Sequence, residues 1–447
     1  MPKNNKGLIY LLIALVMVLI LTVVIVSCKN NTRNTNTNGD PSTIVSSDDG
    51  GNTEPEPTEG PLTYKEITFL SGGDIMYHRP QIRGAKLGEG NYDFTINMQY
   101  IKQIVEKADF ATANFETTLS GPKYNYDKKQ FPFFNAPDST VDSIIGAGFD
   151  LLFTANNHCY DHGGEGIKRT IDVLNEKGID HVGTRKDEST KTYKIVDLKG
   201  IKIGLINYTL ESGSDDSVTR INGNAIANAD LPLLDTFNEA KPDPFYVEVE
   251  QRYKELREQG ADIMIIVLHW GVEYQLEPNN TQKAIAQKLC DIGFDCILAS
   301  HPHVIQPVRV ITSSDGTRKI PCYYSMGNLI SNQNRDSLSS GETSGHNAYT
   351  ENGMLPTLTI RKYSNGETYI KDIEYYATWV HKYGNEKFTI IPLTLALADP
   401  NAYGLNNSST GLERAKKAKE MTAGLCAAGV AEYNALWKDP HPNATAE

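Results

Sequence analysis

Residues 262–269 read Asp-Ile-Met-Ile-Ile-Val-Leu-His, an apolar run with one polar residue at each end. A run that is apolar at every inner position is typical of a strand buried on both faces. Other β-rich runs alternate with helical stretches along the chain, which predicts an α/β fold with helices covering the sheets. The expected strands are 66–72, 109–115, 150–155, 193–198, 201–208, 262–269, 296–300, 305–311, 321–325 and 368–376, and the expected helices are 95–107, 138–147, 164–177, 246–259, 280–293 and 411–437.

The composition is that of a globular protein. The chain has 447 residues, of which 39% are apolar and 22% charged, and these values exclude wholesale disorder and a polytopic membrane protein. Its formal net charge of −12 disfavours non-specific binding to nucleic acids, so we expect no nucleic-acid partner. Six cysteines in a chain of this length exclude a disulfide-stapled scaffold.

The N-terminus predicts export to the membrane. Lys3 and Lys6 precede a run without charged residues, from Leu8 to Ser27. A basic start followed by an apolar run is typical of an export signal, and this run is also long enough to span a bilayer as an uncleaved anchor. Ser27 before Cys28 resembles a lipobox, in which Cys28 is lipidated and becomes the mature N-terminus. Both alternatives tether the chain to the membrane and place the rest of it outside the cytoplasm.

We therefore expect four segments. Residues 1–28 form the signal or anchor. Residues 29–63 contain almost nothing to bury and predict a disordered tether with a root-mean-square reach of about 30 Å. Residues 64–380 form the α/β domain, in which the polar stretches 211–244 and 331–353 are expected to be long surface loops. Residues 381–447 form a helical extension with a polar tail.

Polar side chains with ligand chemistry recur at the ends of the expected strands. Ligands of open α/β sheets bind outside the carboxyl ends of the strands, so one shared site is the simplest explanation for the series. Its members are Asp74, Asn114, Glu116, Asn156, Asn157, His158, Asp161, His269, Glu273, His301, His303 and Asn328.

The mixture of residue types in this series predicts a metal site. Imidazole, carboxylate and amide oxygen ligands together suit a borderline divalent ion such as manganese, zinc or iron. An all-oxygen set would favour magnesium or calcium instead. His301 and His303 lie two residues apart around Pro302, which restricts the backbone between them. We expect one or two ions.

Six ordered motifs resemble the poly-γ-glutamate capsule synthesis family, called CapA or PgsA. The resemblance covers roughly residues 66–331 and implies a bacterial protein anchored on the outer face of the membrane. It also implies a part in making, exporting or releasing an anionic γ-linked polyglutamate, with subunits of the membrane-bound polymer synthase as partners. The motifs are Gly-Gly-Asp at 72–74, Asn-Phe-Glu at 114–116, Asn-Asn-His at 156–158 followed by Asp161 and Gly163, His-Trp-Gly at 269–271, His-Pro-His-Val at 301–304 and Ser-Met-Gly-Asn at 325–328.

That family in turn is similar to the calcineurin-like metallophosphoesterases, which implies a four-layer α-β-β-α sandwich. Met76 stands where those enzymes carry a metal-binding histidine, and Glu116 stands where they carry a bridging aspartate, so a one-metal site is an alternative to a two-metal site. The ligands implied by the resemblance are Asp74, Glu116, Asn157, His269, His301 and His303. The implied catalytic residues are His158, as a general acid, and Asp161. The residues expected to bind substrate are Asn114, Asn156, Glu273 and Asn328.

Two functions of different classes are compatible with these residues. One is a metal-dependent hydrolase of a phosphoester or of a γ-amide bond in polyglutamate, since a divalent ion lowers the pKa of bound water and polarises the scissile centre. The other is a non-enzymatic accessory subunit that binds the polymer or its synthase. His158 favours the enzyme, because a purely structural subunit does not need that residue.

Overall fold

The strand predicted at 262–269 is present as β12 (Ile263–His269) in the computed structural model, and it is buried along its whole length. The structure describes residues 61–126, 133–213 and 218–447. β12 belongs to a seven-stranded sheet with the order β11-β8-β12-β13-β15-β14, in which β7 also pairs with β8. β8, β12, β13 and β15 are parallel, so their carboxyl ends lie at one edge. The other strands of this sheet are β7 (Lys194–Leu198), β8 (Ile201–Leu210), β11 (Thr236–Phe237), β13 (Cys296–Ser300), β14 (Ile305–Thr312) and β15 (Lys319–Met326).

A second sheet, of nine strands within the described residues, is built around β1. Its order is β19-β18-β17-β1-β4-β5-β6, and β16 and β20 also pair with β1. β4 and β16 run parallel to β1, whereas β17 runs antiparallel to it. The strands are β1 (Thr63–Ile75), β4 (Phe110–Phe115), β5 (Leu151–Phe153), β6 (Asp180–Val182), β16 (Asn328–Ile330), β17 (Asn352–Tyr363), β18 (Thr368–Tyr383), β19 (Lys387–Pro392) and β20 (Thr445–Ala446).

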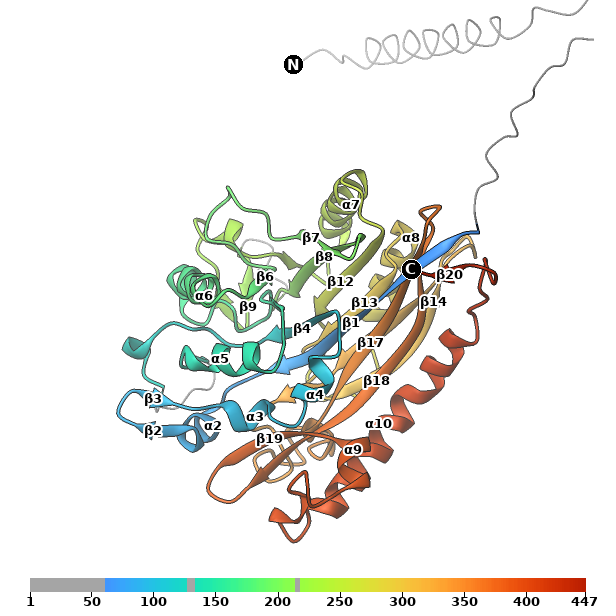
Figure 1. The fold of residues 1–447 in the computed structure, drawn as a ribbon. Helices are drawn as coiled ribbons and strands as arrows, with labels where there is room; N and C mark the ends of the chain where they lie inside the picture. The colour runs from blue at the N-terminus through green and yellow to red at the C-terminus, as the bar shows by residue number, and fades with distance from the viewer. Residues whose placement is uncertain (1–60, 127–132, 214–217) are drawn as a thin grey trace, which may run out of the picture. The chain divides into compact units, whose positions relative to one another are not determined.

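The two sheets pack face to face between helices. Phe69 and Phe153 of the β1 sheet share a buried cluster with Ile265 and Leu298 of the β12 sheet. α5 and α6 cover the outer face of the β1 sheet, and α7 and α8 cover the outer face of the β12 sheet. The layers therefore follow the order helix, sheet, sheet, helix, and Figure 1 shows the strands running between these helices. The helices are α5 (Ser139–Gly146), α6 (Gly163–Lys177), α7 (Asp243–Glu258) and α8 (Asn280–Ile292).

A long C-terminal helix, α10 (Gly411–Asn434), closes one side of the two sheets. It contacts β14 of one sheet and β18 of the other, beside which it runs in Figure 1. Its Cys426 is buried in the cluster between the sheets. At Gly429 the helix lies so close to β14 that an added Cβ would come within 1.9 Å of the Val308 carbonyl oxygen. The helix is therefore part of the core of the domain.

The organisation of the chain differs from expectation after residue 380. That expected boundary falls inside β18, whose residues 378–383 pair with β19. The described residues, from 61 onward, form one compact unit. Residues 381–447 are therefore not a separate extension, because they complete the β1 sheet and supply α10. The short helix α9 (Leu393–Ala398) lies between these two parts.

The smaller elements also refine the expectations. The helix expected over 95–107 is two short helices, α3 (Thr95–Met98) and α4 (Lys102–Val105), and Asn97 Nδ2 donates to the Phe388 carbonyl oxygen of β19 at 2.6 Å. The stretch 211–244 contains β9 (Arg220–Ile221), β10 (Asn224–Ala225) and β11. The remaining α-helix is α2 (Arg79–Gly84), and the remaining strands are β2 (Lys86–Gly88) and β3 (Asn91–Tyr92).

The predicted export signal or anchor at 1–28, its lipidation site Cys28 and the tether as far as residue 60 lie outside the described residues. Within the described part of the chain, no helix combines the length and the apolar character that a membrane crossing requires.

Candidate metal centre

The strand ends of both sheets meet and bring the expected ligands together. In β1, Asp74 is paired in register with Asn114 of β4 and with Asn328 of β16. In the other sheet, His269 ends β12 beside Ser300, which ends β13. The expected metal ligands, all of them buried, are Asp74, Glu116, Asn157, His269, His301 and His303.

The Gly-Gly-Asp motif is needed because the end of β1 packs tightly against the turn that contains Gly327. A Cβ at Gly73 would come within 1.9 Å of the carbonyl oxygen of Gly327, so only glycine fits. The Asp74 N–H donates to that same oxygen at 3.0 Å. The close approach of β1 to the Ser-Met-Gly-Asn turn is what places Asp74 beside Asn328.

Asp74 is held as an anion by three donors. Asn114 Nδ2 donates to Oδ1 of Asp74 at 2.7 Å. The other oxygen of Asp74, Oδ2, lies 3.2 Å from His303 Nδ1 and accepts a hydrogen bond from the His301 backbone N–H at 3.4 Å. Burial by itself raises the pKa of Asp74, but the hydrogen bond and the charge of His303 lower it below its ordinary value. Burial likewise opposes the charged form of His303, and the contact with Asp74 outweighs it and raises the pKa of His303.

Glu116 is buried without such partners. Neither of its carboxylate oxygens has a hydrogen bond within the part of the chain that the structure describes. Oε1 lies 3.5 Å from His269 Nε2 and 3.8 Å from His303 Nε2. Burial first, and the charge of Asp74 second, raise the pKa of Glu116 well above its ordinary value. A buried carboxylate without partners is costly, and a bound cation would remove that cost.

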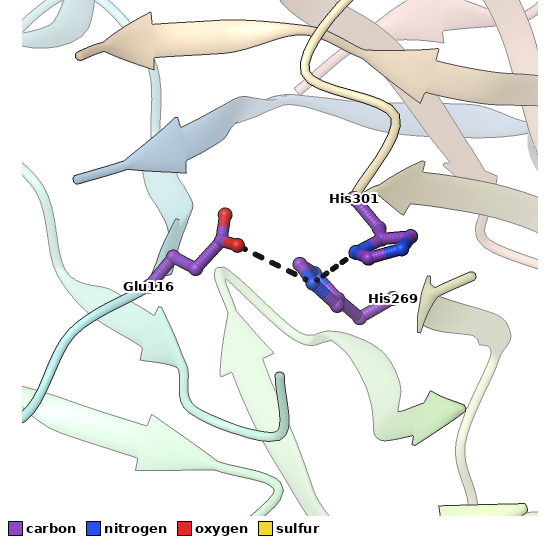
Figure 2. A group of neighbouring side chains, drawn as sticks. All are labelled: Glu116, His269 and His301. Atoms are coloured by element: carbon purple, nitrogen blue, oxygen red, sulfur yellow. Dashed lines mark hydrogen bonds and ion pairs between the residues drawn. The ribbon is translucent and has the colours of Figure 1, made fainter. Parts of the chain in front are cut away.

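His269 is surrounded by atoms that have lone pairs. Its Nε2 lies 2.8 Å from Asn157 Oδ1 and 3.1 Å from His301 Nδ1. Figure 2 shows Glu116 and His301 approaching the His269 ring from two sides. Burial, and then the neighbouring His301, lower the pKa of His269 well below its ordinary value, and burial lowers the pKa of His301 to about 4. Both rings are therefore neutral near pH 7, which is the form that binds a metal ion.

The side chains fit a divalent ion in two overlapping groups. Glu116, His269 and His301 form one group, and Asp74, Glu116 and His303 form the other; within each group the ligand atoms lie within 4.8 Å of one another. Glu116 belongs to both groups. Nitrogen and oxygen lone pairs that converge in a buried space, with an unpartnered carboxylate among them, suit manganese, zinc or iron.

The backbone around the two late histidines is strained. His301 has a φ of 97° and His303 a φ of 57°, values that cost side-chain-bearing residues about 1–3 kcal/mol each. Hydrogen bonds from neighbouring loops hold this shape, since the Tyr274 N–H donates to the Pro302 carbonyl oxygen at 2.8 Å. Strain that the surrounding structure maintains in this way is typical of a functional site.

His158 and Asp161 are brought together as a pair. His158 Nδ1 lies 2.8 Å from Asp161 Oδ2, and the same oxygen accepts the Phe134 N–H at 2.6 Å. The Phe134 ring packs edge-on against His158, with 4.5 Å between ring centroids. Asp161 therefore orients the imidazole, and its second oxygen is buried without a hydrogen bond among the described residues.

The four residues expected to bind substrate have different surroundings. Asn156 Nδ2 donates to the Phe115 carbonyl oxygen at 2.8 Å, and Asn328 Nδ2 donates to the Thr350 carbonyl oxygen at 2.9 Å. Asn114 Nδ2 donates to Asp74, and Asn328 Oδ1 lies 3.2 Å from His303 Nδ1, so these two amides contact expected metal ligands. Glu273 is exposed, and its charge acts on His301 and His303. That these four residues contact substrate stays a prediction.

Three neighbours of the site were not assigned from the sequence. Phe134 contacts both His158 and Asp161, and the Asn222 amide nitrogen lies 3.4 Å from His158 Nδ1. Phe134 comes from a loop and Asn222 from the turn between the short strands β9 and β10, which the sequence did not predict, so no recognised pattern marks them. His78 lies close enough to the centre for the charges of His303 and His158 to act on it. Its position four residues after Asp74 is visible in the sequence, but this spacing does not match the metal-binding histidine that Met76 replaces, so His78 could not be assigned as a ligand.

The fold and the site define an α/β protein with two packed sheets and a candidate divalent metal centre at their strand ends. The chain belongs to the family described as bacterial capsule synthesis protein PGA_cap, whose model matches residues 68–333.

Individual relatives agree with this family. The chain is 29% identical over 279 residues to the capsule biosynthesis protein CapA of Bacillus anthracis, a match that covers 61% of this chain and 62% of that protein. It is 22% identical over 258 residues to a probable polyglutamine synthesis accessory protein of Mycobacterium tuberculosis, covering 58% and 63%. The chain thus spans less than two thirds of the length of these relatives. Among solved structures, it is similar to a putative 5'-nucleotidase from Staphylococcus aureus, with 15% identity, a TM-score of 0.43, and coverage of 70% of this chain and 54% of that one.

Proposed function

We propose that the chain is a membrane-tethered, extracytoplasmic, metal-dependent hydrolase that acts in the synthesis, export or release of the capsule polymer by cleaving a phosphoester or a γ-amide bond. The observation that carries this proposal is Glu116, a buried carboxylate without hydrogen bonds that is shared by two groups of ligand side chains. Membership in the capsule synthesis family supports the biological setting.

The residues that would hold an ion follow from the two ligand groups. Glu116, His269 and His301 would hold one ion, with the side-chain oxygen Oδ1 of Asn157 beside them. Asp74, Glu116 and His303 would hold a second ion. A divalent ion bound there supplies Lewis acidity toward a phosphoryl or carbonyl oxygen and a water of lowered pKa. Met76 follows the end of β1, two residues after Asp74, and has no imidazole to offer, so the second position is expected to be the weaker one or to stay empty.

His158 would supply the proton for the leaving group. Its Nδ1 is committed to the Asp161 carboxylate, so Nε2 is the nitrogen that can give a proton to a departing oxygen or nitrogen. The Asp161 carboxylate fixes the orientation of the ring. Phe134, packed on the ring, restricts its rotation.

The location of the protein belongs to the same proposal. The basic start, the uncharged run and Cys28 support a lipoprotein or an uncleaved anchor. Protease added to intact protoplasts should degrade the domain, and a domain that survives intact would contradict the proposal. Cys28→Ala should abolish lipidation if the lipobox is used, and should change nothing if residues 8–27 remain as the anchor.

The second candidate is an accessory subunit that binds the polymer or its synthase without cleaving it. The name of the mycobacterial relative, an accessory protein of polyglutamine synthesis, favours it.

One experiment separates the two candidates. The full chain is purified, its bound metal is measured, and hydrolysis of an activated phosphoester and of γ-linked polyglutamate is assayed after loading with manganese, zinc or iron. Hydrolysis of either substrate that is lost with a chelator supports the enzyme. A protein that binds metal but is inert on both substrates supports the accessory subunit.

A further inference from the structure

His78 is a half-buried histidine outside both ligand groups. The Asn332 backbone N–H donates to its Nδ1 at 3.3 Å. Because a backbone N–H can only donate, Nδ1 carries no proton, and in the neutral ring the proton is on Nε2. The structure therefore fixes one tautomer of His78, with Nε2–H as a hydrogen-bond donor.

The ring is held in place from several sides. The His78 backbone N–H donates to Gln81 Oε1 at 2.8 Å, where α2 begins. The partner Asn332 is itself held, because Lys382 Nζ donates to its side-chain oxygen at 3.3 Å. The contact at the start of α2 thus holds the backbone of His78, and the Asn332 segment holds Nδ1 of its ring.

Phe134 connects His78 with the catalytic pair. Its ring packs edge-on against His78, with 4.9 Å between centroids, and against His158, with 4.5 Å between centroids. The two histidines therefore flank one phenyl ring. His78 is therefore separated from His158 by a single side chain, and it lies close enough to the centre for the charges of His303 and His158 to act on it.

The ring also stays neutral. Burial, followed by the positive charge of His303, lowers the pKa of His78 to about 3. A neutral donor does not repel a bound cation, and its hydrogen-bonding capacity does not change with pH in the neutral range.

We propose that His78 is a substrate-contacting residue whose Nε2–H donates a hydrogen bond to a negatively charged oxygen of the group bound at the metal centre. The proposal rests on the proposed function, since it assumes that an anionic substrate group binds there. The side chains that would hold the ion would offer it acceptor atoms, so a negatively charged substrate oxygen that is not bound to the ion would need a separate donor.

The test uses two variants of the full-length protein. His78→Phe removes the donor and keeps a ring against Phe134, whereas His78→Gln restores an N–H donor. Loss of one hydrogen bond to a charged oxygen should lower kcat/KM, and the affinity for inorganic phosphate, by about 10- to 100-fold in His78→Phe. His78→Gln should recover most of this loss. His441→Phe, a substitution in the C-terminal tail, is the control and should change neither quantity.

Further measurements distinguish a folding defect from the loss of the hydrogen bond. Circular dichroism and metal content should match the wild type in both His78 variants. In the metal-loaded wild type, two-bond ¹H–¹⁵N correlations of the imidazole should show the Nε2–H tautomer of His78.

Three results would overturn the proposal: an Nδ1–H tautomer, unchanged phosphate affinity in His78→Phe, or equal losses in His78→Phe and His78→Gln. Phosphate binding is measured without turnover, so a protein that binds phosphate through His78 but cleaves nothing would refute the proposed hydrolase and leave this inference standing.

Discussion

Replacing Glu116 by glutamine should stabilise the metal-free protein and weaken its binding of metal. The carboxylate is fully buried and neither oxygen has a hydrogen bond among the described residues. In the metal-free state an unpartnered buried polar group costs about 1–3 kcal/mol, and more when it is charged. Glutamine removes the charge and keeps the shape, so metal-free Glu116→Gln should be more stable than the metal-free wild type at pH 8 by about 1–3 kcal/mol.

The pH dependence of stability is a second argument that Glu116→Gln should stabilise the metal-free protein. Burial and Asp74 raise the pKa of Glu116 well above its ordinary value of 4.5, so the folded protein binds this proton more tightly than the unfolded chain does. The stabilisation that protonated Glu116 gives to the folded wild type is fully present below pH 4.5. It is lost as the pH rises through the folded-state pKa, and the free energy of unfolding then falls by about 1.4 kcal/mol per pH unit at most. The advantage of the variant should therefore vanish near pH 4.

With metal present, the wild type should be more stable than Glu116→Gln. Both ligand groups contain Glu116, so the variant should bind a divalent ion at least tenfold more weakly, which corresponds to about 1.4 kcal/mol. The assay is urea unfolding of the chelator-treated and the metal-saturated protein at pH 4 and pH 8, with metal affinity from calorimetric titration.

Glu351→Gln is the matched control. Glu351 is also buried, but it is paired with Arg335 at 2.9 Å and Arg414 at 3.3 Å. Its substitution should destabilise the protein at pH 8 by about 2 kcal/mol, with and without metal. The reasoning would be refuted if metal-free Glu116→Gln were less stable than the wild type at pH 8, or if its metal affinity were unchanged.

Three further outcomes are expected. His158→Asn should leave metal content near normal and cut hydrolysis in the metal-loaded protein at least tenfold, because asparagine cannot transfer a proton; full activity would remove His158 from the mechanism. Asp161→Asn should lower kcat more than KM, because it loses the 2.8 Å contact that orients His158, and a change in KM alone would argue against that role. Asp74→Ala and His303→Ala should each lower metal stoichiometry in a folded protein, as seen by elemental analysis, whereas His441→Ala should not; a loss of fold with unchanged metal per folded molecule would count against the site.

Much of the fold can be predicted from the sequence because buried strands have a recognisable pattern of apolar residues. The unbroken apolar run of β12 could be read as a strand covered on both faces, and the structure confirms it. The clustering of the ligands could also be predicted, because parallel strands end at one edge and polar residues recur there. Both predictions use patterns that are local in the chain.

Features that depend on distant partners could not be predicted. β18 was expected to end at residue 376, but it continues to Tyr383 because β19 pairs with its second half. The alanine-, lysine- and glutamate-rich sequence of α10 gives no sign that Gly429 packs directly against Val308 of β14. Asn222 and Phe134 approach His158 from loops, so only the tertiary structure brings them to the site.

The most direct test of the metal centre is anomalous diffraction from crystals of the purified protein, recorded at the manganese, iron and zinc edges. The account predicts a peak at about 2.0–2.2 Å from ligand atoms of Glu116, His269 and His301, with a weaker peak or none near Asp74 and His303. Two fully occupied peaks about 3.5–4 Å apart would contradict the expected weakness of the second position. The absence of any peak among these residues, in protein grown and purified with these metals, would contradict the central claim.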